Sequence, residues 1–126
     1  MKVIQIGIDD LDDMLALPTR NLLLFSLDVC APCEWIKQFF IQVGPELESV
    51  DTCAILTLTY GQNHEDQRLG ELGVRHFPTL IMYENGELLG VLRGAITKSG
   101  PLNEVRLLDW LGRTGGERLK VSAPGL

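Results

Sequence analysis

The sequence predicts an α/β domain in which a mixed β-sheet has helices on both faces. Short apolar segments alternate with segments of helical period in the order βαβαβαββα, and an Asn-Gly pair separates the last two strands. Strands joined by helices are expected to run parallel, and the closing hairpin adds an antiparallel edge to the sheet. With 126 residues and no internal linker, the chain is long enough to bury a core without a metal or a disulfide staple.

The first half of the chain contains three of the expected strands, at residues 3–7, 22–27 and 53–59. The second of these is almost wholly apolar, as expected for a strand that is covered on both faces. A helix capped by Asp9 should follow the first strand and end near Pro18, because proline disfavours helical geometry in the residue before it. Another helix is expected from Pro32 to the Gly-Pro pair at 44–45, with core-facing residues at helical spacing, namely Trp35, Ile36, Phe39, Phe40 and Val43.

The second half is expected to contain a short helix, a hairpin and a last helix. The short helix ends at about Leu72, and strands at 79–83 and 87–92 flank the turn at 84–86. The last helix should open at residues 99–101, Ser-Gly-Pro, and bury a stripe at spacing three, formed by Leu102, Val105, Leu108 and Leu111. We expect residues 1–114 to form a single domain and residues 115–126 to be a frayed or disordered tail.

Charge and hydropathy exclude several classes of partner. The chain has 11 basic and 17 acidic residues, a net charge of −6, and its basic residues form no run. Nucleic acids and anionic membranes are therefore not expected as partners, because phosphate binding needs clustered Lys and Arg. No apolar stretch approaches the roughly 20 residues needed to span a bilayer, and the N-terminus lacks a secretory pattern. We expect a cytoplasmic protein.

Two of the three cysteines form the motif Cys30-Ala31-Pro32-Cys33, where the buried strand gives way to a helix. In a reducing compartment such a pair binds a metal or transfers electrons. The start of a helix favours a thiolate at Cys30, because such an end supplies up to about 2 kcal/mol, which is nearly what lowering a thiol pKa from about 8.5 to about 7 requires. Cys33, one turn further into the helix, is placed to attack a mixed disulfide formed by Cys30.

The neighbours of the cysteines predict the direction of electron flow. No His or Lys lies between the cysteines to stabilise a thiolate further, and Asp28 opposes one if its side chain points the same way. Extra thiolate stabilisation is what makes a dithiol protein oxidising, so this site should donate electrons. A second element of the site is Pro78, which belongs at the first residue of its strand because it cannot donate a ladder hydrogen bond. The bond between Phe77 and Pro78 is a candidate for a cis peptide.

These motifs resemble the thioredoxin family, and the resemblance runs from about Asn21 to Leu111. The cysteine motif stands where the family has Cys-Gly-Pro-Cys, and residues 73–80, Gly-Val-Arg-His-Phe-Pro-Thr-Leu, match the family's Gly-Ile-Arg-x-Ile-Pro-Thr-Leu. Residues 84–87 and the Gly-Ala pair at 94–95 extend the match. The resemblance implies a thioredoxin-like three-layer sandwich and the reduction of protein disulfides.

The resemblance also implies roles for individual residues. Cys30 would be the attacking thiolate and Cys33 the resolving thiol, with Pro78 as the cis-proline opposite them. The main chain at Phe77 would hold an extended substrate segment by strand-like pairing. The rest of the substrate-binding surface would be formed by Val29, Ala31 and Pro32. An NADPH-dependent thioredoxin reductase would supply electrons to a monomer that holds no cofactor, since no Gly-rich dinucleotide motif follows a strand.

Three positions depart from the family pattern. Val29 replaces the Trp that usually precedes the first cysteine, Leu24 replaces a buried Asp, and Leu56 is expected to replace the Lys that accompanies that Asp. Losing one member of a buried charge pair leaves an unpaired charge, whereas losing both leaves an apolar contact. The joint change is compatible with a stable fold. It removes a proton acceptor for Cys33, so we expect slower resolution of the mixed disulfide.

Other interpretations use the same residues. The domain could be a redox-inactive or redox-sensing binding or chaperone-like subunit of a larger assembly, which Val29 and Leu24 favour. A glutathione-dependent, glutaredoxin-like enzyme is disfavoured, because Ala-Pro between the cysteines matches thioredoxin instead. A zinc site with His64 and His76 is disfavoured by their spacing of 12 and by the absence of a second cysteine pair. Cys53, alone on an apolar strand, is expected to be a small buried hydrophobe.

Overall fold

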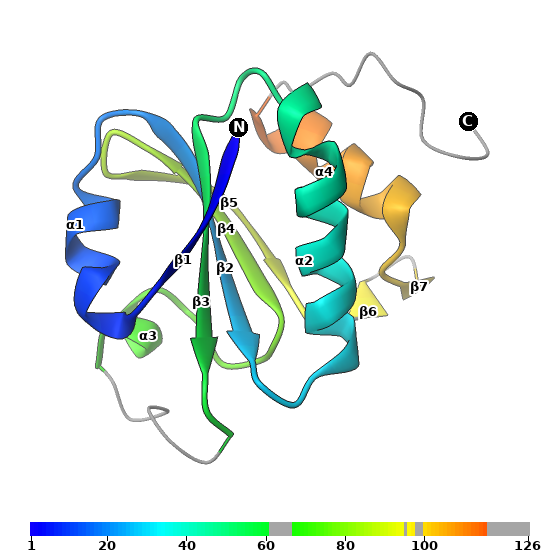
Figure 1. The fold of residues 1–126 in the computed structure, drawn as a ribbon, viewed down its shortest axis with the longest axis horizontal. Helices are drawn as coiled ribbons and strands as arrows, with labels where there is room; N and C mark the ends of the chain where they lie inside the picture. Colours follow the sequence, from blue (N-terminus) through cyan, green and yellow to red (C-terminus); the bar gives the residue numbers. More distant parts are fainter. Residues whose placement is uncertain (61–66, 95, 98–99, 116–126) are drawn as a thin grey trace.

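A mixed five-stranded sheet lies between two helical layers (Figure 1). The computed structural model describes residues 1–60, 67–94, 96–97 and 100–115. The sheet has the order β1-β3-β2-β4-β5, and its strands are β1 (Lys2–Ile6), β2 (Arg20–Leu27), β3 (Thr52–Leu58), β4 (Thr79–Glu84) and β5 (Glu87–Arg93). The short strands β6 (Ile96–Thr97) and β7 (Gly100–Pro101) form a separate ribbon, which the sequence did not predict.

Helices α1 (Leu11–Leu15) and α3 (Gln67–Glu71) lie on one side of the sheet in Figure 1, and α2 (Ala31–Val43) and α4 (Glu104–Gly115) lie on the other. The described residues also form two short 3₁₀ helices, η1 (Ile8–Asp10) and η2 (Gly44–Glu46). The predicted α/β architecture with helices on both faces is therefore confirmed. None of the described helices is long and apolar enough to cross a bilayer.

Strand β4 runs in the direction opposite to the one expected. It follows α3 but pairs antiparallel with β2, whereas β1 and β2 both pair parallel with β3. The prediction that helix-linked strands run parallel is therefore wrong here. The physical reason is length: the five residues of α3 advance only about 7.5 Å, against about 23 Å for the seven residues of β3, so this helix does not carry the chain back along the sheet.

The apolar run of β2 supplies two separate cores. Leu22 and Leu24 face α2 and α4, while Leu23 and Phe25 face α1 and α3. Successive side chains of a strand point to opposite faces, so a strand covered on both sides is expected to be mostly apolar. We call the first cluster the α2-side core; its buried members are Leu22, Leu24, Ile36, Phe39, Phe40, Leu47, Val50, Cys53, Ile55, Leu80, Met82, Leu107, Trp110 and Leu111.

The predicted hairpin between β4 and β5 is confirmed. Asn85 and Gly86, its two central residues, have φ angles of 53° and 78°. Two consecutive residues with positive φ are what a two-residue turn of type I′ requires, and Asn-Gly is the pair that adopts it most readily. The turn therefore brings β5, the edge strand of the sheet, back along β4 in the antiparallel direction.

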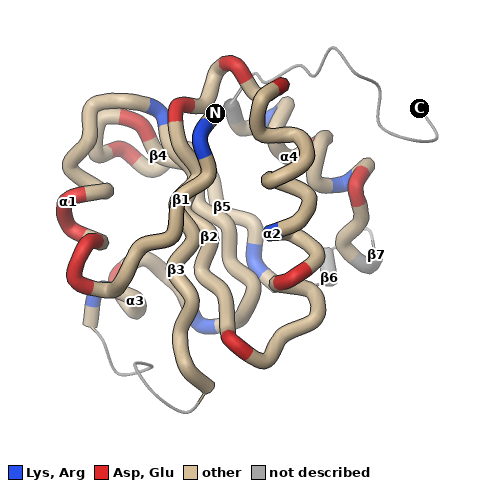
Figure 2. The backbone as a smooth tube through the Cα atoms, in the orientation of Figure 1, with Lys and Arg blue, Asp and Glu red and all other residues tan. Residues whose placement is uncertain are grey.

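The first helix ends before Pro18 as predicted, but Asp9 does not cap it. The short 3₁₀ helix η1 precedes α1, and Asp10 Oδ2 accepts a hydrogen bond of 3.0 Å from Gly7 N. Figure 2 shows the acidic residues that gather on η1 and α1, across the sheet from α2. One of them, Asp12, forms an ion pair of 3.1 Å with Arg68.

The last helix begins later than predicted. Residues 100–101 belong to β7, and α4 starts at Glu104, where Asn103 Oδ1 accepts a hydrogen bond of 3.0 Å from Arg106 N. The stripe at spacing three is confirmed only in part: Leu111 is buried and Leu102 and Leu108 pack against the α2-side core, but Val105 is 44% exposed. A spacing of three falls about 60° short of a full turn at each step, so such a stripe winds around the helix. The fully or almost fully buried residues of α4 are Leu111 and two residues outside the predicted stripe, Leu107 and Trp110.

Candidate active site

Cys30 and Cys33 are joined by a disulfide at the first turn of α2, with their Cα atoms 5.2 Å apart. Cys30 is the N-cap of the helix and has extended backbone angles, φ −160° and ψ 103°. Its Sγ accepts a hydrogen bond of 3.2 Å from Cys33 N, one of the helix donors that has no partner within the helix. Pro32 stands in the first turn, where the N–H that it lacks would have had no helical acceptor.

The two cysteines differ in their access to solvent. Cys33 is completely buried, whereas Cys30 is partly exposed and its neighbours Val29, Ala31 and Pro32 are exposed. A protein partner can therefore reach the first sulfur of the pair and not the second. In the reduced state, the positive end of the helix dipole would favour the anion of the accessible thiol.

The carboxylate of Asp28 is engaged with the end of β3. Asp28 Oδ1 accepts a hydrogen bond of 3.1 Å from Tyr60 N, and Asp28 N donates one of 3.0 Å to Leu58 O. The sequence left open whether this charge opposes a thiolate at Cys30. In the structure its hydrogen-bonding partner lies on the neighbouring loop, and the side chain ties the loop before the cysteines to the one after β3.

The Phe77–Pro78 peptide bond is cis, and it lies at the same edge of the sheet as the cysteines. The antiparallel register pairs Thr79, the first residue of β4, with Phe25, two residues before the end of β2. Pro78 is buried and Phe77 is half-buried. Two hydrogen bonds hold this segment: Gly94 N donates to Pro78 O at 2.7 Å, and Thr79 Oγ1 donates to His76 O at 2.6 Å.

The predicted partner of Leu24 is wrong by one residue. Leu24 pairs in register with Ile55, and both are fully buried in the α2-side core, whereas Leu56 pairs with Phe25 on the other face. A shift of one residue along a strand moves a side chain to the opposite face, so position 56 cannot stand beside position 24. The buried members of the α2-side core include no carboxylate and no amine.

Cys53 and His76, two further residues of metal-binding type, lie in the described part of the chain. Cys53 is a free, fully buried cysteine on β3, as predicted, and its burial raises the pKa of the thiol to about 12. His76 is exposed, and His64 lies outside the described residues. Within the described part of the chain, no three His, Cys, Asp or Glu residues are arranged to hold a metal ion.

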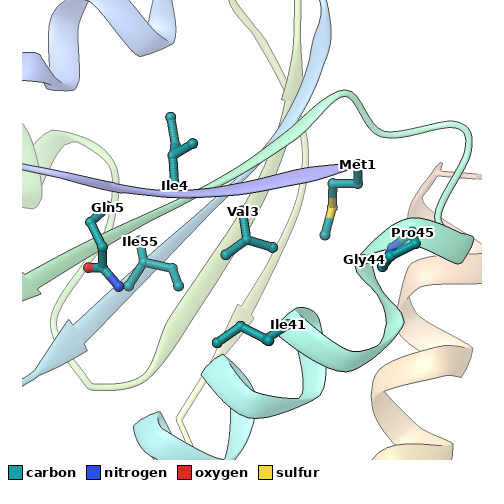
Figure 3. Close-up of a pocket in the computed structure, with 8 residues that line it drawn as sticks. All are labelled: Met1, Val3, Ile4, Gln5, Ile41, Gly44, Pro45 and Ile55. Carbon is teal, nitrogen blue, oxygen red and sulfur yellow. The ribbon is translucent and has the colours of Figure 1, made fainter.

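A hollow of about 380 Å³ lies at the other end of α2, between that helix and β1 (Figure 3). No charged side chain lines it; the lining residues are Met1, Val3, Ile4, Gln5, Ile41, Gly44, Pro45 and Ile55. The cysteine pair begins α2, whereas Gly44 and Pro45 follow its last residue, so the hollow is separate from the disulfide.

Comparisons with known proteins agree with this geometry. No family model matches the chain. Thioredoxin from Rickettsia typhi is 28% identical over 90 residues, which cover 71% of this chain and 76% of that protein. Thioredoxin from Rhodospirillum rubrum is 28% identical over 103 residues, 79% of this chain and 86% of that protein. The chain is thioredoxin-like.

Solved structures show the same fold. Thioredoxin f from spinach chloroplast superposes with a TM-score of 0.67 at 18% identity, covering 90% of this chain and 93% of that one. Thioredoxin f2 from Chlamydomonas reinhardtii gives a TM-score of 0.65 at 20% identity, covering 88% and 94%. The thioredoxin-like three-layer sandwich predicted from the sequence is therefore confirmed.

Sequence analysis did not single out Tyr60. Its side chain is 73% exposed, and its backbone is held by Asp28 beside the cysteine loop of this thioredoxin-like chain. The sequence feature that could have identified Tyr60 is its position: it is an aromatic residue just beyond a strand that runs parallel to the strand leading to Cys30.

Trp35 also differs from its prediction as a core residue. It is 39% exposed and packs against Phe39, with ring centroids 5.9 Å apart.

Proposed function

We propose that this chain is a thioredoxin-type protein-disulfide reductase that works through Cys30 and Cys33. The observation that supports this most directly is the disulfide itself: it joins a partly exposed N-cap cysteine to a fully buried one. Similarity to thioredoxins over most of the chain supports the same activity.

The reaction begins from the reduced dithiol. The Cys30 thiolate attacks one sulfur of a substrate disulfide, and the other substrate sulfur leaves as a thiolate that takes up a proton. Cys33 loses its proton and attacks Cys30 Sγ, which releases the second substrate sulfur and forms the Cys30–Cys33 disulfide. Two electrons pass from the dithiol to the substrate. The structure corresponds to the oxidised protein at the end of this cycle.

The substrate is proposed to lie across the exposed rim of the disulfide. Val29, Ala31 and Pro32 form one side of this rim, and the Phe77–Pro78 segment lies at the same edge of the sheet. An extended substrate strand could pair with main-chain groups at Phe77, in the manner of strand addition. Such pairing accepts many sequences, because the main chain supplies the hydrogen bonds.

The remaining parts of the proposal concern the setting of the reaction. A thioredoxin reductase that uses NADPH would return two electrons to the disulfide. The functional unit would be a cytoplasmic monomer formed by the single domain of residues 1–114. The five-stranded sheet with a core on each face supports a single domain. The cysteine pair, which is suited to a reducing compartment, supports a cytoplasmic location.

Reduction of insulin disulfides, with dithiothreitol or a thioredoxin reductase and NADPH as donor, tests this function. Wild-type protein should accelerate the reaction, and Cys30→Ser should abolish the acceleration. Cys33→Ser should accumulate a mixed disulfide with the substrate, because the resolving thiol is gone. The matched control is Cys53→Ala, which alters the third cysteine and should keep activity.

Other outcomes would favour the other functions. An inactive wild type with an intact, reducible dithiol would contradict the proposal and favour a binding or chaperone-like subunit. Turnover sustained by glutathione and glutathione reductase alone would favour a glutaredoxin-like enzyme.

A further inference from the structure

Tyr60 is an exposed aromatic residue whose backbone is fixed beside the cysteine loop. It lies two residues beyond the end of β3, and its side chain is 73% exposed. A single exposed apolar group is ordinary on a protein surface, so exposure alone assigns no role. The position of the backbone is what distinguishes Tyr60.

Two hydrogen bonds through Asp28 fix that position. The carboxylate accepts from Tyr60 N at 3.1 Å, and the Asp28 amide donates to Leu58 O at 3.0 Å. Asp28 precedes Cys30 by two residues, so their Cα atoms are separated by at most roughly 7 Å. Residues 58–60 and the residues before the cysteines are thereby held side by side at the edge of the sheet where β2 and β3 end (Figure 1).

Two acidic residues close to this edge have partners within the chain. Asp28 is bound to a backbone N–H, and Glu34 forms an ion pair of 3.0 Å with Lys37 along α2. Among the described residues next to these groups, two exposed apolar side chains are open to a partner: Val29, 77% exposed, and Tyr60, 73% exposed. An aromatic side chain has only two rotatable side-chain bonds, so it provides contact area at little cost in conformational entropy.

We propose that Tyr60 is a specificity-determining residue, which contacts an apolar or aromatic side chain next to the reactive cysteine of an extended polypeptide substrate. Asp28 is its positioning residue. The inference rests on the proposed reductase function and adds to it a preferred class of substrate. Position 29, just before the first cysteine, carries Val, so Tyr60 would supply an aromatic contact that position 29 does not.

Two disulfide peptides that differ only in the residue beside the cysteine, Phe or Ser, test the proposal, with hydroxyethyl disulfide as a small reference substrate. The measured quantity is kcat/KM for each peptide divided by the value for the reference. Tyr60→Ser should lower this ratio about threefold to tenfold for the Phe peptide, through KM, and should hardly change it for the Ser peptide. Tyr60→Phe, which keeps the ring, should recover most of the loss.

Variants of Asp28 separate its hydrogen bond from its charge. Asp28→Asn keeps an acceptor oxygen for Tyr60 N and should resemble wild type in the Phe-to-Ser preference, whereas Asp28→Ala should resemble Tyr60→Ser. The matched control is Leu88→Ser, which removes an apolar side chain of 54% exposure beside the β4–β5 hairpin, at the other end of the sheet.

The outcomes are distinguishable. An unchanged ratio for Tyr60→Ser in an active enzyme would overturn this inference and leave the reductase function standing. A wild type that reduces neither peptide would overturn the reductase function, and the inference with it. An equal loss in Leu88→Ser would also overturn the inference, because the effect would then not be specific to the site.

Discussion

Leu24 and Ile55 are register partners on β2 and β3, and both side chains are fully buried in the α2-side core. This pair occupies the layer under the helix that begins at the cysteines. Because neither side chain can take up a proton, the thiol of Cys33 has no acceptor from these two positions. The contact stabilises the fold as an ordinary apolar pair does. We expect it to slow the step in which Cys33 attacks the mixed disulfide, because this step needs the Cys33 thiol to lose its proton.

Leu24→Asp should accelerate release of substrate from the mixed disulfide. Burial will raise the pKa of the new carboxyl, so the gain should grow as pH rises from about 7 to about 9 and the group ionises. The variant should also lose about 2–5 kcal/mol of stability, as expected for a polar group placed in an apolar core. Stopped-flow measurement of product release gives the rate, and urea unfolding shows that the protein is folded.

The matched control is Leu24→Asn, which has a similar shape but cannot accept a proton in this pH range. Equal release rates for the Asp and Asn variants across the pH series would contradict a proton-acceptor role at this position.

Cys53 should make the protein less stable in alkali. Burial raises the pKa of its thiol from 9.0 to about 12, so between these values the unfolded chain loses a proton that the folded protein keeps. Stability therefore falls as pH rises above about 9, and the contribution is fully present below it. Urea unfolding of the oxidised protein from pH 8 to pH 10.5 should show a shallower decline for Cys53→Ala than for wild type.

Tyr83 provides a second, separable contribution. Its pKa is raised from 10.0 to about 12 by burial, and its hydroxyl donates to Met14 O. Tyr83→Phe should remove the part of the decline that begins near pH 10 and leave the part that begins near pH 9. If neither variant changes the slope, these two groups are not the source of the alkaline loss.

Thiol labelling should distinguish the three cysteines of the reduced protein. Cys30 is partly exposed at a helix N-terminus, Cys33 is fully buried behind it, and Cys53 is fully buried in the core. A thiol reagent should label Cys30 first and Cys33 more slowly, and should reach Cys53 only after denaturation. Mass spectrometry of quenched time points assigns each label. Rapid labelling of Cys53 in native protein would show that the α2-side core is open.

The face of α4 that packs on the sheet can be tested by stability. Trp110 is 5% exposed and Val105 is 44% exposed. Trp110→Ala should cost about 3–5 kcal/mol, whereas Val105→Ala should change the stability by no more than about 0.5 kcal/mol. Equal losses of unfolding free energy for the two variants in chemical denaturation would contradict this assignment of the buried face of α4.

Local chemistry made much of this fold predictable. The apolar run of β2 marked a strand buried on both faces, and Asn85-Gly86 marked a hairpin, because few other pairs accept two positive φ angles. The cysteine motif and Pro78 placed the candidate site at one edge of the sheet. Each of these signals lies within a few residues of the structure that it predicts.

Features that depend on distant partners were not predictable in the same way. The direction of β4 depends on which strand it meets, and the choice between Ile55 and Leu56 depends on a register that a single sequence does not contain. The role of Asp28 required knowing that Tyr60 lies 3.1 Å from its carboxylate, 32 positions away in the chain. The start of α4 was predicted too early because Pro101 is also compatible with a helix start, whereas Asn103 is the residue that caps the helix.

The central position of β2 has a consequence for how the reactive sulfur behaves in time. β2 is hydrogen-bonded to β3 on one side and to β4 on the other, and both of its faces are covered. Such strands exchange their amide protons only when the whole domain opens. Cys30 follows this strand by three residues, so we expect its backbone to move little, and we expect the target disulfide to adjust its conformation when the two meet.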